Sequence, residues 1–184
     1  MYLNSVVKRV FDLAGFFVSI FVFGPIFIFI AVCIYFDDKK NTFFIQERVG
    51  KNGVRINVYK FRTMENGVVT RVGHWLRKTG LDELPQYINV FKGEMSIVGP
   101  RPLTDFDIKR LKWESELNRW AMCPGLTGLA QIRSGVSAEH SLQADLEYQK
   151  SANIWLDIKI ILISFLMNLF GKRKVQSKIA QFIF

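Results

Sequence analysis

The 184-residue chain is long enough for one domain with a hydrophobic core, and its formal net charge of +9 favours polyanionic partners: nucleic acid, anionic membrane or phosphorylated substrates. Hydrophobic residues make up 49% of it and 17 residues are Phe, which is high for a soluble domain and indicates lipid contact. Two distant cysteines, Cys33 and Cys123, and two isolated histidines argue against a disulfide and against a zinc site.

Residues 13–36 form an apolar run without a charged residue. As one helix this run would reach about 36 Å, against a hydrocarbon core of about 30 Å, so a single spanning helix is the simplest interpretation. Gly24 and Pro25 interrupt the run, and proline removes a backbone donor and clashes with the preceding turn, so a kink or a helical hairpin stays open. Cations flank both ends of the run: Lys8, Arg9, Lys39 and Lys40.

Residues 43–64 predict a β-hairpin, because alternating apolar residues lie on either side of an Asn52-Gly53 turn. Its second strand ends in Lys60-Phe61-Arg62, which points two cations to one face of the strand. These cations indicate either a phosphate-binding surface or an ordinary solvated strand face.

Three amphipathic helices are predicted after the hairpin, over 81–92, 105–122 and 138–152, the last as a surface helix. Gly93 is expected to end the first of them. The glycine-rich loop 124–137 and the 138–152 helix are expected to contact a sugar substrate.

Residues 153–171 are apolar but contain Asp157 and Lys159, so the segment is marginal for spanning a membrane. A helix that lies in the membrane interface, or one that packs against the first apolar segment, fits it equally well. Four cations follow, and such cations gain about 1 kcal/mol each near anionic lipid headgroups. The alternative is a frayed, solvated tail. The apolar end of the chain, 179–184, would support a homo-oligomer. The basic cluster consists of Lys172, Arg173, Lys174 and Lys178.

Asp82 and Glu83 stand side by side in TGLDELPQ. One interpretation is a helix start, because Thr79-x-x-Asp82 matches a capping box and acids complement the helix dipole. The other is a catalytic site: a cap needs only one acid, and Arg77 and the proline-bracketed Arg101 supply nearby cations. Paired carboxylates with guanidinium groups suggest Mg²⁺ and a phosphate in one site.

The strings LRKTGLDELPQYINVFKGEMSIVGPRPL, YKFRTM and PGLTGLAQI closely resemble the bacterial sugar transferase family, the monotopic phosphoglycosyl transferases. The resemblance runs from about residue 8 to about residue 170, with this chain as the minimal catalytic form. Departures from the family pattern include Gly80, Glu94 and Cys123. Cys123 weakens any phosphate role assigned to its position.

The resemblance implies transfer of a sugar-1-phosphate from a UDP-sugar to undecaprenyl phosphate, with release of UMP. Asp82 matches the nucleophile and Glu83 its partner, and both are expected to hold Mg²⁺. Arg77 and Arg101 match phosphate-contacting arginines, with Lys60 and Arg62 as further candidates. Because carboxylates are ionised near neutral pH, Asp82 needs no base, and Glu83 is expected to position metal or tune Asp82.

The implied architecture is an α+β, mostly helical monotopic membrane protein on the cytoplasmic face of the bacterial inner membrane. A re-entrant helix hairpin broken at Gly24-Pro25 would precede a small β-hairpin and amphipathic interfacial helices. Segments 1–40, 41–152 and 153–184 are expected to form one structural unit. Expected partners are UDP-sugar, undecaprenyl phosphate and anionic lipids, without nucleic acid. Rival readings are a non-enzymatic membrane adaptor and a metal-dependent lipid phosphatase.

Overall fold

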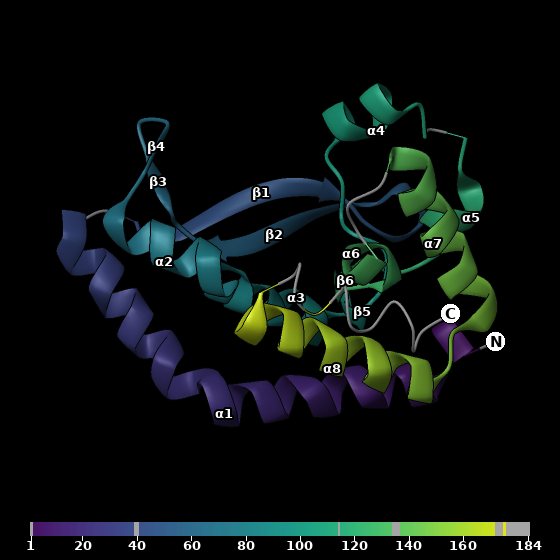
Figure 1. Cartoon of the computed structure of the whole chain (residues 1–184), viewed down its shortest axis with the longest axis horizontal. Helices are drawn as coiled ribbons and strands as arrows, with labels where there is room; N and C mark the ends of the chain where they lie inside the picture. The colour runs from purple at the N-terminus through teal and green to yellow at the C-terminus, as the bar shows by residue number, and fades with distance from the viewer. Residues whose placement is uncertain (1, 39–40, 114, 134–136, 172–174, 176–184) are drawn as a thin grey trace.

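A computed structural model describes residues 2–38, 41–113, 115–133, 137–171 and 175. The fold is α+β and mostly helical, as the sequence predicts. A long helix, α1 (Val6–Asp38), runs along one side of the molecule, and the other elements lie on its inner side (Figure 1). The basic cluster after residue 171 and the apolar end 179–184 fall outside the described residues, except Val175.

Helix α1 contains Pro25 and is bent along its length, but it is one helix and not the predicted hairpin (Figure 1). A proline removes its own backbone donor and crowds the preceding turn, which bends a helix without reversing it. α1 is long and apolar enough to cross a membrane, and only 17% of its most apolar window is buried. Its outward apolar side chains include Phe17, Phe21, Phe29 and Phe36.

Both arms of α1 pack against the same domain. In the first arm, the Phe16 ring stacks on Phe91 of α3 (Tyr87–Lys92) with 4.8 Å between ring centroids. In the second arm, Ile30 and Ile34 are buried in a cluster with Phe61 and Leu76. Because α1 is bent, both of its arms contact the same domain, whereas one arm of a straight helix would extend away from it.

The predicted β-hairpin is confirmed. Strands β1 (Phe43–Val49) and β2 (Arg55–Phe61) pair antiparallel with Phe43 opposite Phe61. Their link is a single 3₁₀ turn, η2 (Lys51–Gly53), in which Asn52 and Gly53 take positive φ values of 55° and 77°. There are also two smaller two-stranded sheets: β3 (Met64–Glu65) with β4 (Val68–Val69), and β5 (Ser96–Val98) with β6 (Gly125–Thr127).

The segment predicted as a helix over 81–92 divides into a 3₁₀ helix, η3 (Leu81–Gln86), and α3. Pro85 lies at the end of η3 and Gly93 ends α3 with a φ of 82°, as predicted. The preceding helix, α2 (Arg71–Thr79), starts at a Thr70 cap, whose side chain accepts from the Gly73 amide.

The helix predicted over 105–122 is wrong as one element. The structure has α4 (Asp105–Leu111) and α5 (Leu117–Trp120), and Lys112 between them takes a φ of 57°, which ends α4. A capping box of Thr104 and Asp107 fixes the start of α4. Amphipathic spacing continues across this break because Trp113 and Trp120 pack into the same buried cluster.

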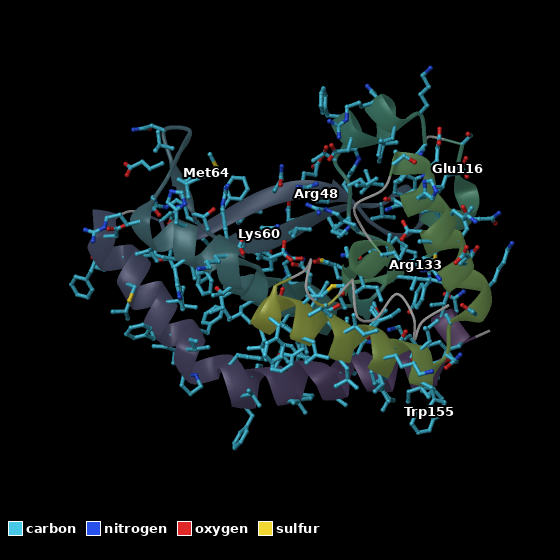
Figure 2. The ribbon with its side chains drawn as sticks, viewed as in Figure 1. Arg48, Lys60, Met64, Glu116, Arg133 and Trp155 are labelled. Atoms are coloured by element: carbon cyan, nitrogen blue, oxygen red, sulfur yellow. The ribbon has the colours of Figure 1, made fainter. Side chains whose placement is uncertain are left out.

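The C-terminal helices are α6 (Leu129–Arg133), α7 (Ala138–Ser151) and α8 (Ile154–Phe170). Helix α7 starts at the predicted residue and ends one residue early, and it is not simply a surface helix, because it buries Tyr148 in the main core. Helix α8 also enters this core through Ile160 and Met167, and its opposite face exposes Trp155, 72% accessible, toward the side of α1 (Figure 2).

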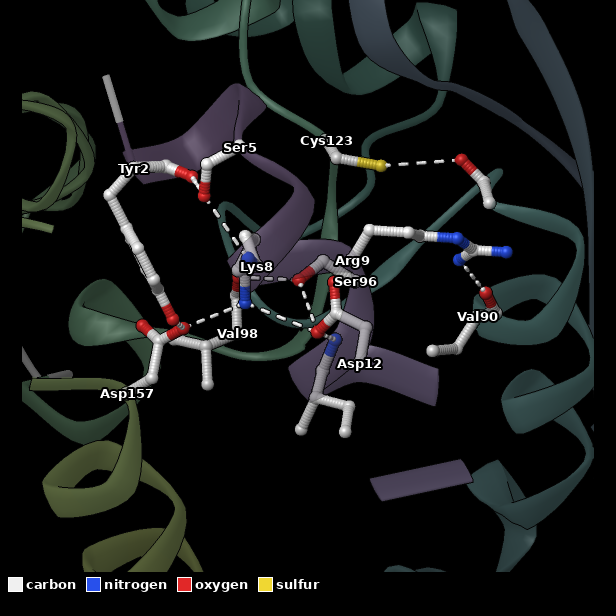
Figure 3. Close-up of polar contacts among 12 residues, drawn as sticks. Tyr2, Ser5, Lys8, Arg9, Asp12, Val90, Ser96, Val98, Cys123 and Asp157 are labelled. Atoms are coloured by element: carbon white, nitrogen blue, oxygen red, sulfur yellow. Dashed lines mark hydrogen bonds and ion pairs between the residues drawn. The ribbon is translucent and has the colours of Figure 1, made fainter. Parts of the chain in front are cut away.

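A buried polar network ties α1 to the domain (Figure 3). Lys8 donates to Asp157 of α8 at 2.7 Å and to Asp12 at 3.2 Å, and Asp12 accepts from the Ile97 amide of β5. Lys8 is only 4% exposed, so it is a buried ion-pair partner and not a solvent-exposed cation at the start of the apolar run. Asp157 packs against α1 through this contact, in agreement with the interpretation in which the last apolar segment packs against the first.

Candidate active site

One cleft of about 780 Å³ brings together all six site residues predicted from the sequence. Its walls come from the β1–β2 hairpin, from α2 and η3, and from β6, α6 and α8. Lys60 and Arg48 both project from the hairpin (Figure 2). The predicted residues in its lining are Lys60, Arg62, Arg77, Asp82, Glu83 and Arg101.

Asp82 and Glu83 occupy the first turn of η3, at the cleft. Gly80 precedes them with a φ of 71°, which ends α2 and starts η3 without a spacer residue. The capping-box interpretation of Thr79 is wrong, because its hydroxyl donates to the Trp75 and Leu76 carbonyls of α2. The acids remain at a helix start, but no side chain caps it.

Glu83 is paired with Lys60 of β2, whose Nζ donates to Oε1 at 2.6 Å. The Lys60 side chain is only 21% exposed, so the solvated-strand interpretation is wrong for this residue. The pair joins the hairpin to η3, and it places a cation beside the acid pair before any ligand binds.

Asp82 is partly buried, and its environment acts on its charge. Burial raises the pKa of the Asp82 carboxyl, and the Glu83 charge raises it further. Lys60 and Arg77 act in the opposite direction. Asp82 therefore ionises at a higher pH than an ordinary aspartate, because its environment disfavours the charged form.

The three remaining predicted cations differ in how firmly they are held. Arg77 donates through Nε to the Thr63 hydroxyl at 2.9 Å, and Arg62 donates through Nε to the Asn41 carbonyl at 2.6 Å. Arg101 is exposed, and its guanidinium has no hydrogen bond or ion pair with another described residue. Among the described residues, it also caps no helix carbonyl.

The family model for bacterial sugar transferases matches residues 3–171. The chain belongs to the bacterial sugar transferase family. It is 36% identical to the UDP-glucose:undecaprenyl-phosphate glucose-1-phosphate transferase of Klebsiella pneumoniae, over 88% of this chain and 40% of that protein. It is 34% identical to the undecaprenyl-phosphate glucose phosphotransferase of Komagataeibacter xylinus, over 90% of this chain and 36% of that protein.

A relative of similar length is the exopolysaccharide production protein PSS of Rhizobium leguminosarum, which is 36% identical over 86% of this chain and 93% of that protein. The sequence motifs thus identified the family correctly. The chain spans less than half of the longer relatives, between 36% and 44% of the length of three of them.

Arg48 is a cleft cation of this sugar transferase that the sequence analysis missed. It donates to the Gln46 side chain at 2.6 Å and to the Pro102 carbonyl at 3.3 Å, which ties β1 to the turn that carries Arg101. Burial lowers the pKa of the Arg48 guanidinium. The Asp107 charge raises this pKa, and the Arg101 charge lowers it further. Strand alternation was an available signal, since Gln46 and Arg48 lie on one face of β1.

The cleft lining includes only part of the segments that the sequence predicts to contact a sugar. Thr127 and Gln131 from the 124–137 loop line the cleft, but none of the described residues of α7 does. Ser164 and Asn168 of α8 also line the cleft, and no local motif marks them. Cys123 lies outside the cleft lining, where burial raises the pKa of its thiol to about 11.

The donor set of the cleft fits Mg²⁺ that is shared with a substrate. Among the residues that the structure describes, no three His, Cys, Asp or Glu side chains gather as a metal site. The protein therefore offers the carboxylates of Asp82 and Glu83, and Mg²⁺ is commonly held by one or two carboxylates with phosphate oxygens and water.

Proposed function

We propose that the chain transfers a sugar-1-phosphate from a UDP-sugar to a polyprenyl phosphate, which is undecaprenyl phosphate in the names of the Klebsiella and Komagataeibacter relatives, and releases UMP. The observation that carries this proposal is a half-buried carboxylate, Asp82, in a cleft lined by Arg48, Lys60, Arg62, Arg77 and Arg101. Such a cleft attracts a diphosphate to a nucleophile that would otherwise repel it. The transfer would commit a sugar to the membrane as the first step of surface glycan synthesis.

In the first step, an Asp82 oxygen attacks the phosphorus that carries the sugar. The bond from this phosphorus to the bridging oxygen breaks, and UMP leaves with the electron pair. An aspartyl phosphosugar remains. In the second step, an oxygen of the polyprenyl phosphate attacks the same phosphorus and the Asp82 carboxylate leaves. Neither step needs a proton, because all three nucleophiles and leaving groups are anions.

The cations of the cleft offset the charge of both steps. Arg77 and Arg101 carry planar forks that suit phosphate oxygens, and Arg101 makes no competing contact within the described chain. Mg²⁺ bound to Asp82 and Glu83 would add charge neutralisation at the phosphate oxygens. Glu83 then supports the site: it holds Lys60 through their ion pair, and its charge raises the pKa of Asp82.

Helix α1 is proposed to enter and leave the membrane on its cytoplasmic face. Both arms pack on one domain, through Phe16 and through Ile30 and Ile34, while the outward face exposes large apolar residues. A helix that crossed the membrane would carry one arm away from these contacts. The cleft would then lie near the interface, where a lipid phosphate meets a cytosolic nucleotide without moving charge through hydrocarbon.

The activity is tested with the purified full chain in lipid nanodiscs, supplied with Mg²⁺ and a panel of UDP-sugars, with and without undecaprenyl phosphate. We expect UMP release and a lipid-linked sugar phosphate, both lost in Asp82→Asn. Asp105→Asn is the matched control, since Asp105 is exposed and pairs with Arg55 outside the cleft. Full activity of Asp82→Asn would refute the nucleophile, and inorganic phosphate as the product would indicate a lipid phosphatase.

The topology is tested by placing single cysteines at the exposed positions Asn4 and Asn41, in a chain whose Cys33 and Cys123 have been replaced. An impermeant maleimide should label both from the cytoplasmic side in sealed vesicles. Labelling from opposite sides would restore the spanning helix.

A further inference from the structure

One part of the cleft lining is polar but uncharged. Four residues from three elements form it, and the cations that line the cleft come from other segments: β1, β2 and the residue after it, α2 and the turn after β5. The Thr127 and Ser164 hydroxyls share a short hydrogen bond, which fixes β6 to α8. We call this lining the neutral wall; its members are Thr127, Gln131, Ser164 and Asn168.

The carboxamide of Gln131 has an unused acceptor. Its Nε2 donates to the Leu126 carbonyl at 3.5 Å, and a carbonyl only accepts, so this contact sets which end of the amide faces which way. Its Oε1 is buried and has no hydrogen-bond partner among the described residues. A buried polar atom without a partner costs about 1–3 kcal/mol, so a ligand that donates to it recovers this energy.

The backbone leaves room around that acceptor. A side-chain carbon at Gly128 would sit 2.6 Å from the Gln131 Oε1 and 2.1 Å from the Gly99 carbonyl oxygen. Glycine at this position therefore permits both the close packing of β5 on β6 and the placement of the Gln131 amide.

We propose that the neutral wall is a subsite for the uncharged hydrogen-bonding part of the nucleotide sugar, and that Gln131 Oε1 accepts from one of its N–H or O–H groups. The inference rests on the proposed function. A polyprenyl phosphate offers only hydrocarbon and phosphate, which suit apolar and cationic surfaces. Uracil, ribose and sugar offer neutral donors, which suit an amide oxygen and hydroxyls.

This assignment makes Gln131 a specificity-determining residue. A site built to bind a hydroxyl or an N–H rejects an analogue that lacks the group far more strongly than an apolar pocket rejects a missing methylene. The donor group comes from the nucleoside or from the sugar, and the two sources predict different binding patterns.

The test measures dissociation constants by calorimetry for UMP, UDP and several UDP-sugars. The parent protein is the full chain in nanodiscs with the Asp82→Asn substitution, which prevents turnover. Gln131→Met keeps the length of the side chain but removes the acceptor, and we expect about tenfold weaker binding. Gln143→Met is the control, because Gln143 is exposed on α7, outside the cleft lining. It should bind like its parent.

Weaker binding of UMP, UDP and UDP-sugars alike would support the subsite and assign Gln131 to the nucleoside. Weaker binding of UDP-sugars alone would support it and assign Gln131 to the sugar. Unchanged constants for every ligand in a folded Gln131→Met chain would overturn the subsite while leaving the transferase proposal intact. A parent chain that binds no UDP-sugar would overturn the proposed function itself.

If Gln131→Met does not fold, Asn168→Leu gives a second test, since Asn168 is exposed on α8 and lines the cleft. We expect about threefold weaker binding of the same ligands. Constants equal to those of the parent would overturn the neutral wall as a subsite.

Discussion

Two clusters in this sugar transferase use the same residue types, one lysine and two acids, for different ends. Lys8, Asp12 and Asp157 lie in the core, where none is more than 4% exposed. Lys60, Asp82 and Glu83 line an open cleft. The buried cluster joins α1 to α8 and β5, whereas the cleft cluster faces the space that a ligand would fill.

The difference lies in how completely the charges are paired. Both oxygens of Asp157 accept hydrogen bonds, from Tyr148 at 2.7 Å and from Tyr2 and Lys8 at 2.9 and 2.7 Å. In the cleft, Lys60 pairs with Glu83, and among the described residues no side chain donates a hydrogen bond to the Asp82 carboxylate. Complete pairing makes a cluster structural, while incomplete pairing beside exposed cations leaves a carboxylate able to react.

The largest effect is expected from breaking the buried cluster. Asp157→Ala leaves Lys8 and two tyrosine hydroxyls without their shared partner, and we expect about 3–5 kcal/mol lower free energy of unfolding. Urea denaturation of the nanodisc-bound chain, followed by tryptophan fluorescence, measures it. A change below about 1 kcal/mol would show that the cluster does not hold α1 to the domain.

Lys60→Met should separate stability from activity. The Lys60–Glu83 pair is partly exposed, so the unfolding free energy should fall by only about 0.2–1 kcal/mol. Because a cation beside the reacting carboxylate is lost, kcat/KM for UMP release should fall about 10- to 100-fold. Loss of several kcal/mol of stability with unchanged kcat/KM would place Lys60 with the structural cluster instead.

Arg48→Met is expected to act on the cleft with a smaller effect. It removes a cation and the contact with the Pro102 carbonyl, which supports the turn that carries Arg101. We expect about a tenfold fall in kcat/KM for UMP release. Arg110→Met, an exposed arginine on α4 outside the cleft, should change it by less than twofold.

The smallest effects are expected in the titration of Asp82, followed by carboxyl ¹³C NMR of metal-free protein. Burial and Glu83 raise its pKa, while Lys60 opposes them. Glu83→Gln removes a raising charge, so the midpoint should move to lower pH; Lys60→Met removes a lowering charge, so it should move to higher pH. Shifts of the same sign in both variants would contradict this electrostatic account.

The local elements were largely predictable from the sequence because their signals are local. The Asn52-Gly53 turn set the hairpin, Gly93 set the end of α3, and spaced motifs identified the family and the acid pair. The break at Lys112 was not predictable, because the hydrophobic spacing that implies one helix arises here from Trp113 and Trp120 in one cluster.

What the sequence by itself determined was the kind of chemistry: an acid pair before a proline, cations at Arg77 and Arg101, and an apolar run interrupted at Pro25. What the tertiary structure alone decided was which charged side chains are paired in the core and which face the cleft. Lys8 and Lys60 read alike in the sequence, but one is buried between two acids of different helices and the other faces a cleft. The difference comes from segments that are distant in the sequence. A charge is neutralised by its neighbours in space, and the sequence shows only its neighbours along the chain.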